Sequence, residues 1–136
     1  TSAADRAPDD QLRTERTRPR TTTPVVWGHG TRDFEAALVA AKATGKKIFL
    51  DFEAVWCGPC HTMDEWIWTD AEVAAKLNAE YIGVKLDVDL EKAMVTRFGT
   101  KGYPTMIILG PDGSELRRVV EYQSSVKMLE FLGPKP

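Results

Sequence analysis

Two cysteines separated by two residues, Cys57 and Cys60, constrain this chain more than any other feature, and its 136 residues contain no other cysteine. The stretch 47–53, with apolar residues at 48–50 and 52, precedes them and predicts a buried strand, and a helical pattern begins at about 57–59. A thiol pair between the end of a strand and the start of a helix is well placed for thiol–disulfide exchange. Because no cysteine remains for a structural framework, the pair is catalytic, metal-binding or haem-attaching.

The composition is that of one soluble globular domain, with 43% hydrophobic and 28% charged residues. The formal net charge of −2 gives no sign of the clustered positive charge that nucleic-acid binding needs, so no nucleic-acid partner is expected. No apolar run reaches the roughly 18–20 residues of a membrane-spanning helix, so no membrane span is expected within the chain.

The first 24 residues differ in composition from the rest. They contain three prolines, five arginines and four acidic residues, but only one large apolar side chain, Leu12. So little apolar surface does not offset the entropy lost on ordering, which predicts a disordered tail or spacer at 1–24 and a folded domain at 25–136. Because the chain starts at Thr1 rather than Met, it is interpreted as a processed or trimmed form, with room for a signal peptide or membrane anchor before residue 1.

The domain is predicted to be α/β, with a mixed central sheet flanked by helices in the order β-α-β-α-β-α-β-β-α. Crossover helices imply parallel pairing of the first strands, and the Gly-Pro-Asp-Gly turn at 110–113 implies an antiparallel pair at the end. Strands are expected at 25–27, 47–53, 81–88, 105–109 and 115–121, and helices at 32–44, at about 57–78 with a break near 68–70, at 91–98 and after Ser124 or Ser125.

Cys57 is the expected nucleophile, because the free N–H groups and the dipole at a helix N-terminus stabilise a thiolate. Cys60 follows on the same side of the helix and is expected to attack the mixed disulfide and release the partner. Pro59 suits the first turn of a helix, and Gly58 leaves room for the partner's backbone.

Two other uses of the cysteines stay open at this point. Residues 57–61 read C-x-x-C-H, which is also the attachment pattern of c-type haem, although no haem-pocket pattern surrounds it. A zinc site needs two further ligands, and His61 and the distant His29 are the only histidines. We expect neither a haem nor a metal.

Several separated motifs together resemble the thioredoxin-like family. The run 56–60 (Trp-Cys-Gly-Pro-Cys) resembles the active-site motif of thioredoxin, and 50–52 (Leu-Asp-Phe) and 102–105 (Gly-Tyr-Pro-Thr) resemble that family's other motifs. The resemblance covers about 25–132, and the long segment 61–80 is more similar to bacterial thioredoxin-like domains of thiol:disulfide interchange proteins. It implies a thioredoxin fold and a thiol–disulfide oxidoreductase with no cofactor beyond its own redox-active disulfide.

The resemblance also implies roles for residues outside the cysteine motif. Pro104 matches the cis-proline that lies against the cysteine pair, and Trp56 and Tyr103 would help it to shape the partner groove. Asp51 matches the buried acid that takes a proton from the resolving cysteine, and Lys85 matches its lysine neighbour. Burial raises the pKa of such an acid and the lysine lowers it; the alternative is a plain buried ion pair without a catalytic part.

Three further residues are possible modulators. Glu53 stands where the family often has an aromatic residue, and we hypothesise that it raises the thiol pKa or relays a proton; the alternative is a solvated strand end. Glu121 occupies the place of a glycine beside the substrate groove, where it would narrow the groove or favour basic partners. His61 follows the resolving cysteine and either stabilises a thiolate modestly or is simply an exposed helix residue.

The Gly-Pro dipeptide between the cysteines is similar to that of reducing family members. The predicted activity is therefore reduction of protein disulfides, with an upstream dithiol or reductase as the electron donor. A disulfide oxidase or isomerase and a non-enzymatic docking module are the alternatives. The missing Met and the spacer-like tail favour the bacterial periplasm or cell envelope over the cytoplasm, and we expect a monomer.

Overall fold

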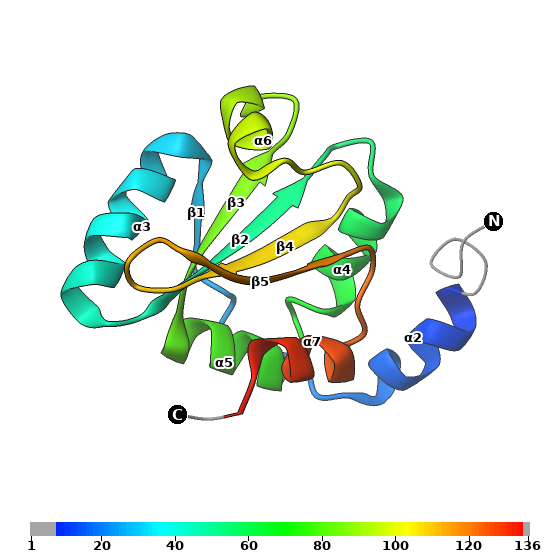
Figure 1. The fold of residues 1–136 in the computed structure, drawn as a ribbon. Helices are drawn as coiled ribbons and strands as arrows, with labels where there is room; N and C mark the ends of the chain where they lie inside the picture. The colour runs from blue at the N-terminus through cyan, green and yellow to red at the C-terminus, as the bar shows by residue number, and fades with distance from the viewer. Residues whose placement is uncertain (1–7, 135–136) are drawn as a thin grey trace.

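The computed structural model describes residues 8–134, which contain a five-stranded mixed sheet (Figure 1). The strand order is β1-β3-β2-β4-β5, with parallel pairing among β1, β3 and β2 and antiparallel pairing of β4 with β2 and with β5. The predicted mixed sheet is therefore confirmed. The strands are β1 (Trp27–His29), β2 (Lys47–Glu53), β3 (Tyr81–Asp87), β4 (Thr105–Leu109) and β5 (Glu115–Val120).

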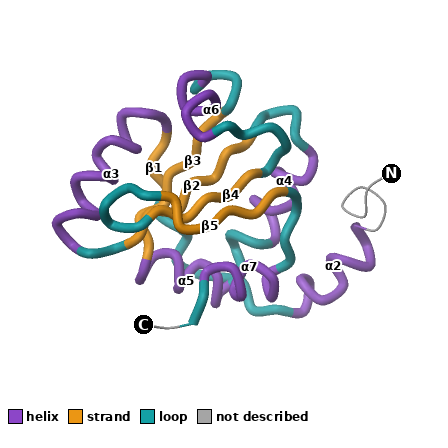
Figure 2. Tube along the Cα trace, in the orientation of Figure 1, coloured by secondary structure: helices purple, strands orange, loops and turns teal. Residues whose placement is uncertain are grey.

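Helices lie against both faces of this sheet (Figure 2). In β2, Ile48, Leu50 and Phe52 pack in the core beneath α3 and α6, whereas Phe49 packs with α4, α5 and α7. Asp51 alternates onto the second face, so its carboxyl group lies on the α4 side. Within residues 8–134 no helix is both long and apolar enough to cross a bilayer. The helices are α2 (Pro8–Thr17), α3 (Gly30–Thr44), α4 (Gly58–Trp66), α5 (Ala71–Glu80), α6 (Lys92–Phe98) and α7 (Ser125–Leu132).

The break predicted near 68–70 separates α4 from α5. Asp70 is the N-cap of α5, and its carboxylate accepts a hydrogen bond from the Val73 N–H at 3.1 Å. Trp68 is buried in the core, whereas Trp66 is half-buried beneath the Arg20 guanidinium, 5.3 Å from the ring centroid. The break therefore turns the chain so that two tryptophans two residues apart have different surroundings.

The first strand lies two residues beyond its predicted position. The sequence predicts it at 25–27 with a break at Gly28, but it runs from Trp27 to His29, and α3 follows directly. Trp27 lies opposite Gly83 of β3, and its ring is 2.9 Å from the point that a Cβ at 83 would occupy. The missing side chain at 83 makes room for the indole, a fit between distant segments that the local pattern does not reveal.

The prediction of a disordered tail is wrong for residues 8–24; the part of it that falls on 1–7 lies outside the described residues. Residues 8–17 form α2, and an isolated antiparallel bridge joins Arg20 to Asp70 at the start of α5. Arg20 Nη1 also donates to the Trp66 carbonyl at 2.7 Å. The role of this segment as a spacer stays a prediction.

Hydrogen bonds and an ion pair, rather than buried apolar side chains, hold residues 15–20 against the domain. The Glu15 carboxylate is buried and accepts a hydrogen bond from the Ser125 N–H at 3.0 Å, at the start of α7. The Arg18 guanidinium binds Asp70 through two hydrogen bonds. Because these partners lie more than 50 residues away, counting apolar side chains in residues 1–24 misses them.

Arg18→Ala is expected to lower the free energy of unfolding by about 2 kcal/mol. Arg18 Nε lies 2.6 Å from Asp70 Oδ1, and the Asp70 side chain is only 1% exposed, so the variant leaves a buried carboxylate without its main cation. Urea unfolding measures the loss. In an Asp70→Asn background the same substitution should have a much smaller effect, and an equal effect in both backgrounds would contradict the pairing.

Candidate active site

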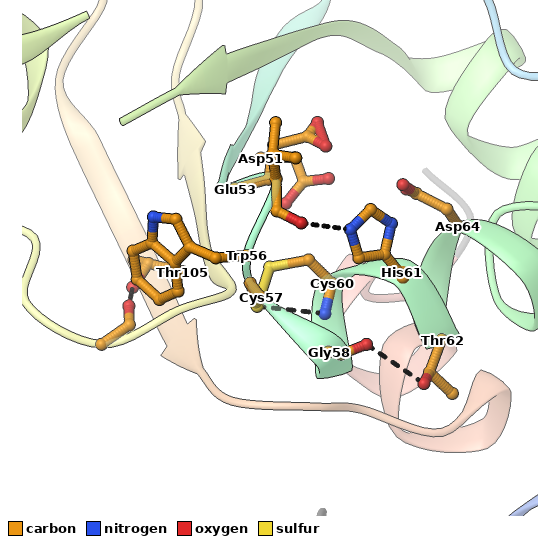
Figure 3. Close-up of a disulfide and its surroundings, with 12 residues drawn as sticks. Asp51, Glu53, Trp56, Cys57, Gly58, Cys60, His61, Thr62, Asp64 and Thr105 are labelled. Atoms are coloured by element: carbon orange, nitrogen blue, oxygen red, sulfur yellow. Dashed lines mark hydrogen bonds between the residues drawn. A yellow bond between two sulfur atoms is a disulfide. The ribbon is translucent and has the colours of Figure 1, made fainter. Parts of the chain in front are cut away.

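The two cysteines form a disulfide at the start of α4, four residues beyond the end of β2 (Figure 3). Cys57 is the N-cap of α4, and its Sγ accepts a hydrogen bond from the Cys60 N–H at 3.1 Å. Gly58 begins the helix, and Pro59 lies in the first turn, where no hydrogen bond needs its missing N–H. The sulfur of Cys57 thus lies at the positive end of α4, which stabilises a thiolate.

The residue before Cys57 presents an aromatic ring to the surface. Trp56 is 66% exposed, its Nε1 donates to Asp89 Oδ2 at 3.0 Å, and its ring meets Tyr103 edge-on at 6.1 Å between centroids. The Cys57 N–H donates to the Ala54 carbonyl at 3.1 Å, which closes the turn before the cysteine. Trp56 and Tyr103, both predicted to shape the partner groove, are therefore in contact.

His61 anchors the same turn from the opposite side. In Figure 3 it lies across the cysteine pair from Trp56. Its Nε2 is 2.6 Å from the Val55 carbonyl oxygen, which can only accept, so Nε2 carries the proton. His61 is exposed, yet its ring is held by the backbone of the active-site loop. Its predicted effect on the thiolate stays a prediction.

His61→Leu is expected to lower kcat/KM for a small peptide disulfide about fivefold, because one hydrogen bond holding the loop before Cys57 is lost. His61→Gln should keep most of the activity, since an amide N–H can reach the same carbonyl. Steady-state reduction kinetics of both variants test this. Equal losses in the two variants would assign the effect to the imidazole itself rather than to the anchor.

The Tyr103–Pro104 peptide bond is cis, and Pro104 is buried. Its carbonyl accepts a hydrogen bond from the Glu121 N–H at 2.8 Å, which ties the proline loop to the end of β5. Glu121 has a φ of 79°, in the left-handed region that favours glycine. An exposed glutamate therefore stands beside the proline loop at a position whose backbone suits glycine.

Glu121→Gly should raise the free energy of unfolding by about 0.5–1 kcal/mol, because relief of the left-handed strain outweighs the extra entropy of the unfolded glycine chain. Glu121→Ala keeps a Cβ and should give no such gain. Thermal unfolding of the two variants distinguishes them. A gain in the alanine variant would mean that the carboxylate, and not the backbone, is responsible.

Asp51 is buried on the β2 face that packs toward α4. Its pKa is raised to about 7, chiefly because burial disfavours the charged form; nearby Lys85 acts to lower this pKa, and the carboxylates of Glu53 and Asp64 act to raise it. Lys85 Nζ lies 3.3 Å from Asp51 Oδ2, while Asp51 Oδ1 has no hydrogen-bond partner among the described residues. Burial lowers the pKa of Lys85, but the three carboxylates outweigh this and hold it above its usual value. Asp51 is thus an acid that gains and loses a proton near neutral pH.

Two more carboxylates share Lys85 with Asp51. Lys85 Nζ lies 2.6 Å from Asp64 Oδ1 and 3.2 Å from Glu53 Oε2. Glu53 is therefore an ion-pairing group rather than a fully solvated strand end; its effect on the thiols stays a prediction. Asp64 is not among the residues predicted from the sequence. It follows Cys57 by seven residues, which places it on the same face of α4, and that spacing was the available signal.

The three acids Asp51, Glu53 and Asp64 bring oxygen atoms within 4.8 Å of one another, as a metal site would require. Lys85 contacts all three, so the chain supplies its own cation there. We assign no metal to this cluster. The cysteines are joined to each other and the His61 ring bonds a backbone carbonyl, so the geometry gives no support to the zinc alternative.

Residues 29–111 match the thioredoxin-like family. The chain belongs to this family. Its 34% identity with the thiol:disulfide interchange protein DsbD of Pseudomonas fluorescens extends over 89 residues, which is 62% of this chain but 15% of that protein. Its 32% identity with the thioredoxin H-type of Oryza sativa subsp. indica extends over 99 residues, 71% of this chain and 75% of that protein. The family resemblance drawn from the separated motifs is therefore confirmed.

Comparison with solved structures supports the fold. A thioredoxin from Thermus thermophilus aligns over 81% of this chain and 85% of its own, with a TM-score of 0.70 at 23% identity. The predicted thioredoxin fold is confirmed. The segment that contains α2 and Trp27 lies before the stretch matched to the family.

Proposed function

We propose that this domain is a thiol–disulfide oxidoreductase that reduces protein disulfides. The observation that carries the proposal is the Cys57 sulfur at the N-cap of α4, within 3.1 Å of the Cys60 N–H. In the reduced form, the Cys57 thiolate attacks one substrate sulfur, and the substrate's other sulfur leaves as a thiolate. Cys60 then attacks Cys57 Sγ, releases the second substrate thiolate and forms the Cys57–Cys60 disulfide. Two electrons pass from the dithiol to the substrate.

Proton transfer in the second step is assigned to Asp51. Cys60 must lose its proton to attack, and a carboxyl group whose pKa is raised by burial to about 7 accepts a proton near neutral pH. Lys85 lies against Asp51 and is held in turn by Glu53 and Asp64. Pro104, Tyr103 and Trp56 are proposed to receive the partner's extended chain.

The direction of electron flow is testable through the reduction potential. We expect a strongly reducing value, in the range of about −270 mV that thioredoxin shows. Equilibration of the Cys57–Cys60 pair with glutathione or dithiothreitol measures it. A value near about −120 mV would make the domain an oxidase, and cysteine-independent partner binding with no insulin reduction would make it a docking module.

The cellular setting is the second part of the proposal. An upstream dithiol or reductase returns the pair to the reduced form, and the domain works as a monomer in the bacterial periplasm or cell envelope. The similarity to bacterial thiol:disulfide interchange proteins supports this location, although the chain corresponds to only 15% of the length of the Pseudomonas fluorescens protein. Cell fractionation with an antibody against the chain tests the location, and light scattering tests the monomer.

A further inference from the structure

A cavity of about 760 Å³ is lined in part by Glu53 and Asp64, two of the residues drawn around the disulfide in Figure 3. Part of its wall comes from residues before the family-matched stretch, which begins at 29. These are Thr21, Pro24 and Val25 of the segment after α2, together with Trp27 of β1. The contacts that hold the N-terminal segment against the α4–α5 junction therefore also build one side of this cavity.

Part of the cavity lining is aromatic. Trp27 and Trp68 both line it and meet edge-on, with 5.5 Å between ring centroids. Trp68 is almost fully buried, and its Nε1 has no hydrogen-bond partner within the part of the chain that the structure describes. Leu90, which is 78% exposed, also contributes to the lining. A ligand there would meet aromatic side chains and one exposed apolar side chain.

The cavity also carries negative charge. Glu53, Asp64, Asp87 and Glu91 line it, and Lys85 is the only lysine or arginine among its described lining residues. Lys85 is already bound by three carboxylates, so the acids that line the cavity leave it with a net negative charge. The loop 87–91 also carries Asp89, an acidic residue outside the cavity lining. Asp89 accepts a hydrogen bond from Trp56, the residue before Cys57.

We propose that this cavity binds an arginine or lysine side chain of the partner protein, carried near the disulfide that Cys57 attacks. The proposal rests on the proposed function and adds a substrate preference to it. Carboxylates bind guanidinium and ammonium groups, and the Trp27 ring already faces one ammonium group, Lys85 Nζ, at 5.0 Å from its centroid. The aliphatic stem of the same side chain suits the apolar lining. A glutamate at that place in the partner would be repelled.

Binding can be measured apart from chemistry. Cysteine-free peptides that differ only in a central Arg, Gln or Glu are titrated into the full oxidised chain, and amide chemical shifts are followed by NMR. The Arg peptide should bind at least fivefold more tightly than the Gln peptide and should shift the cavity-lining residues. Equal binding of the Arg and Gln peptides, or shifts that avoid the cavity, would overturn the proposal.

Charge variants at Leu90 test the location, because this exposed side chain can change without disturbing a core. Leu90→Lys should weaken binding of the Arg peptide at least fivefold, and Leu90→Glu should strengthen it. Val39→Lys is the matched control, since Val39 is 71% exposed and lies on α3 away from the cavity lining. Equal weakening by Leu90→Lys and Val39→Lys would assign the effect to net charge and refute the site.

Reduction kinetics connect the cavity to turnover. For two disulfide peptides with Arg or Gln next to the cystine, KM should be at least fivefold lower for Arg with kcat unchanged, and Leu90→Lys should remove the difference. If the Arg peptide binds but neither disulfide is reduced, the proposed function fails and the cavity assignment stands. If both disulfides are reduced equally and the Arg peptide does not bind, the cavity assignment fails and the proposed function stands.

Discussion

Cys60→Ser is expected to stop turnover of a protein disulfide and to leave the substrate covalently attached to Cys57. The Cys57 sulfur at the N-cap of α4 retains its thiolate-stabilising position in this variant, so the first attack still proceeds. Without a resolving thiol, the mixed disulfide persists. Cys57→Ser should also stop turnover, by more than about 100-fold, but should capture nothing, because the attacking group is lost.

Non-reducing electrophoresis with a labelled disulfide protein measures both outcomes. A stable adduct is expected with Cys60→Ser alone, and dithiothreitol should release it. The Cys57→Ser/Cys60→Ser variant is the control for non-covalent association. Adducts of equal amount from both single variants would show that the two thiols are equivalent, contrary to their different places in α4.

Most of the sheet could be predicted because its signals are local. The strand at 47–53 has apolar residues at 48–50 and 52, and the strand at 105–109 is apolar from 106 to 109; the structure has both with the predicted bounds. The turn at 110–113 fixes the antiparallel pair that follows. The cysteine motif is also a local signal, since a strand, a tight turn and a helix start occur within about 15 residues.

What could not be predicted depends on contacts between distant segments. The first strand is fixed by Trp27 occupying the space beside Gly83, 56 positions later in the chain. The N-terminal segment is ordered by Arg18 and Glu15, whose partners are Asp70 and Ser125. A count of apolar residues within one segment gives no information on such polar pairs, so a segment with a single large apolar residue was expected to be disordered.

The candidate site shows the same division. The positions of Asp51 and Lys85 follow from strand alternation, because the two lie directly opposite in the β2–β3 register. Asp64 reaches the same ammonium from α4, and this required knowledge of how the helix packs on the sheet. Burial sets most of the cost of the Asp51 charge, and the group of three carboxylates around one lysine adjusts it.

Asp51→Asn is expected to raise the free energy of unfolding of the oxidised domain at pH 8 by up to about 4 kcal/mol. Burial raises the Asp51 pKa from 3.8 to about 7, so the folded state holds a proton that the unfolded chain gives up. The difference between a pKa of 3.8 in the unfolded chain and about 7 in the folded domain, at 1.36 kcal/mol per tenfold change in proton affinity, yields this figure. Asparagine has nearly the same shape and carries no charge, so the variant avoids burying an anion.

The gain should depend on pH in a defined direction. Because the folded pKa is the higher one, the wild type has its full stability below about pH 4 and loses it as the pH rises to about 7. The difference between Asp51→Asn and wild type should therefore be near zero at pH 4, grow through pH 5–7 and level off above that. Urea unfolding at constant ionic strength across pH 4–8 measures this difference.

Asp64→Asn is the matched control, because Asp64 contacts the same Lys85 but its side chain is 38% exposed. Removing this exposed carboxylate should cause a small loss of stability at neutral pH rather than a gain. A constant difference between Asp51→Asn and wild type at every pH would place the effect in packing instead of ionisation. A kinetic measurement separates the proposed catalytic role of Asp51 from its effect on stability. Asp51→Asn should slow release of the partner from the mixed disulfide and leave Cys57 alkylation unchanged, because only the attack by Cys60 requires a proton acceptor.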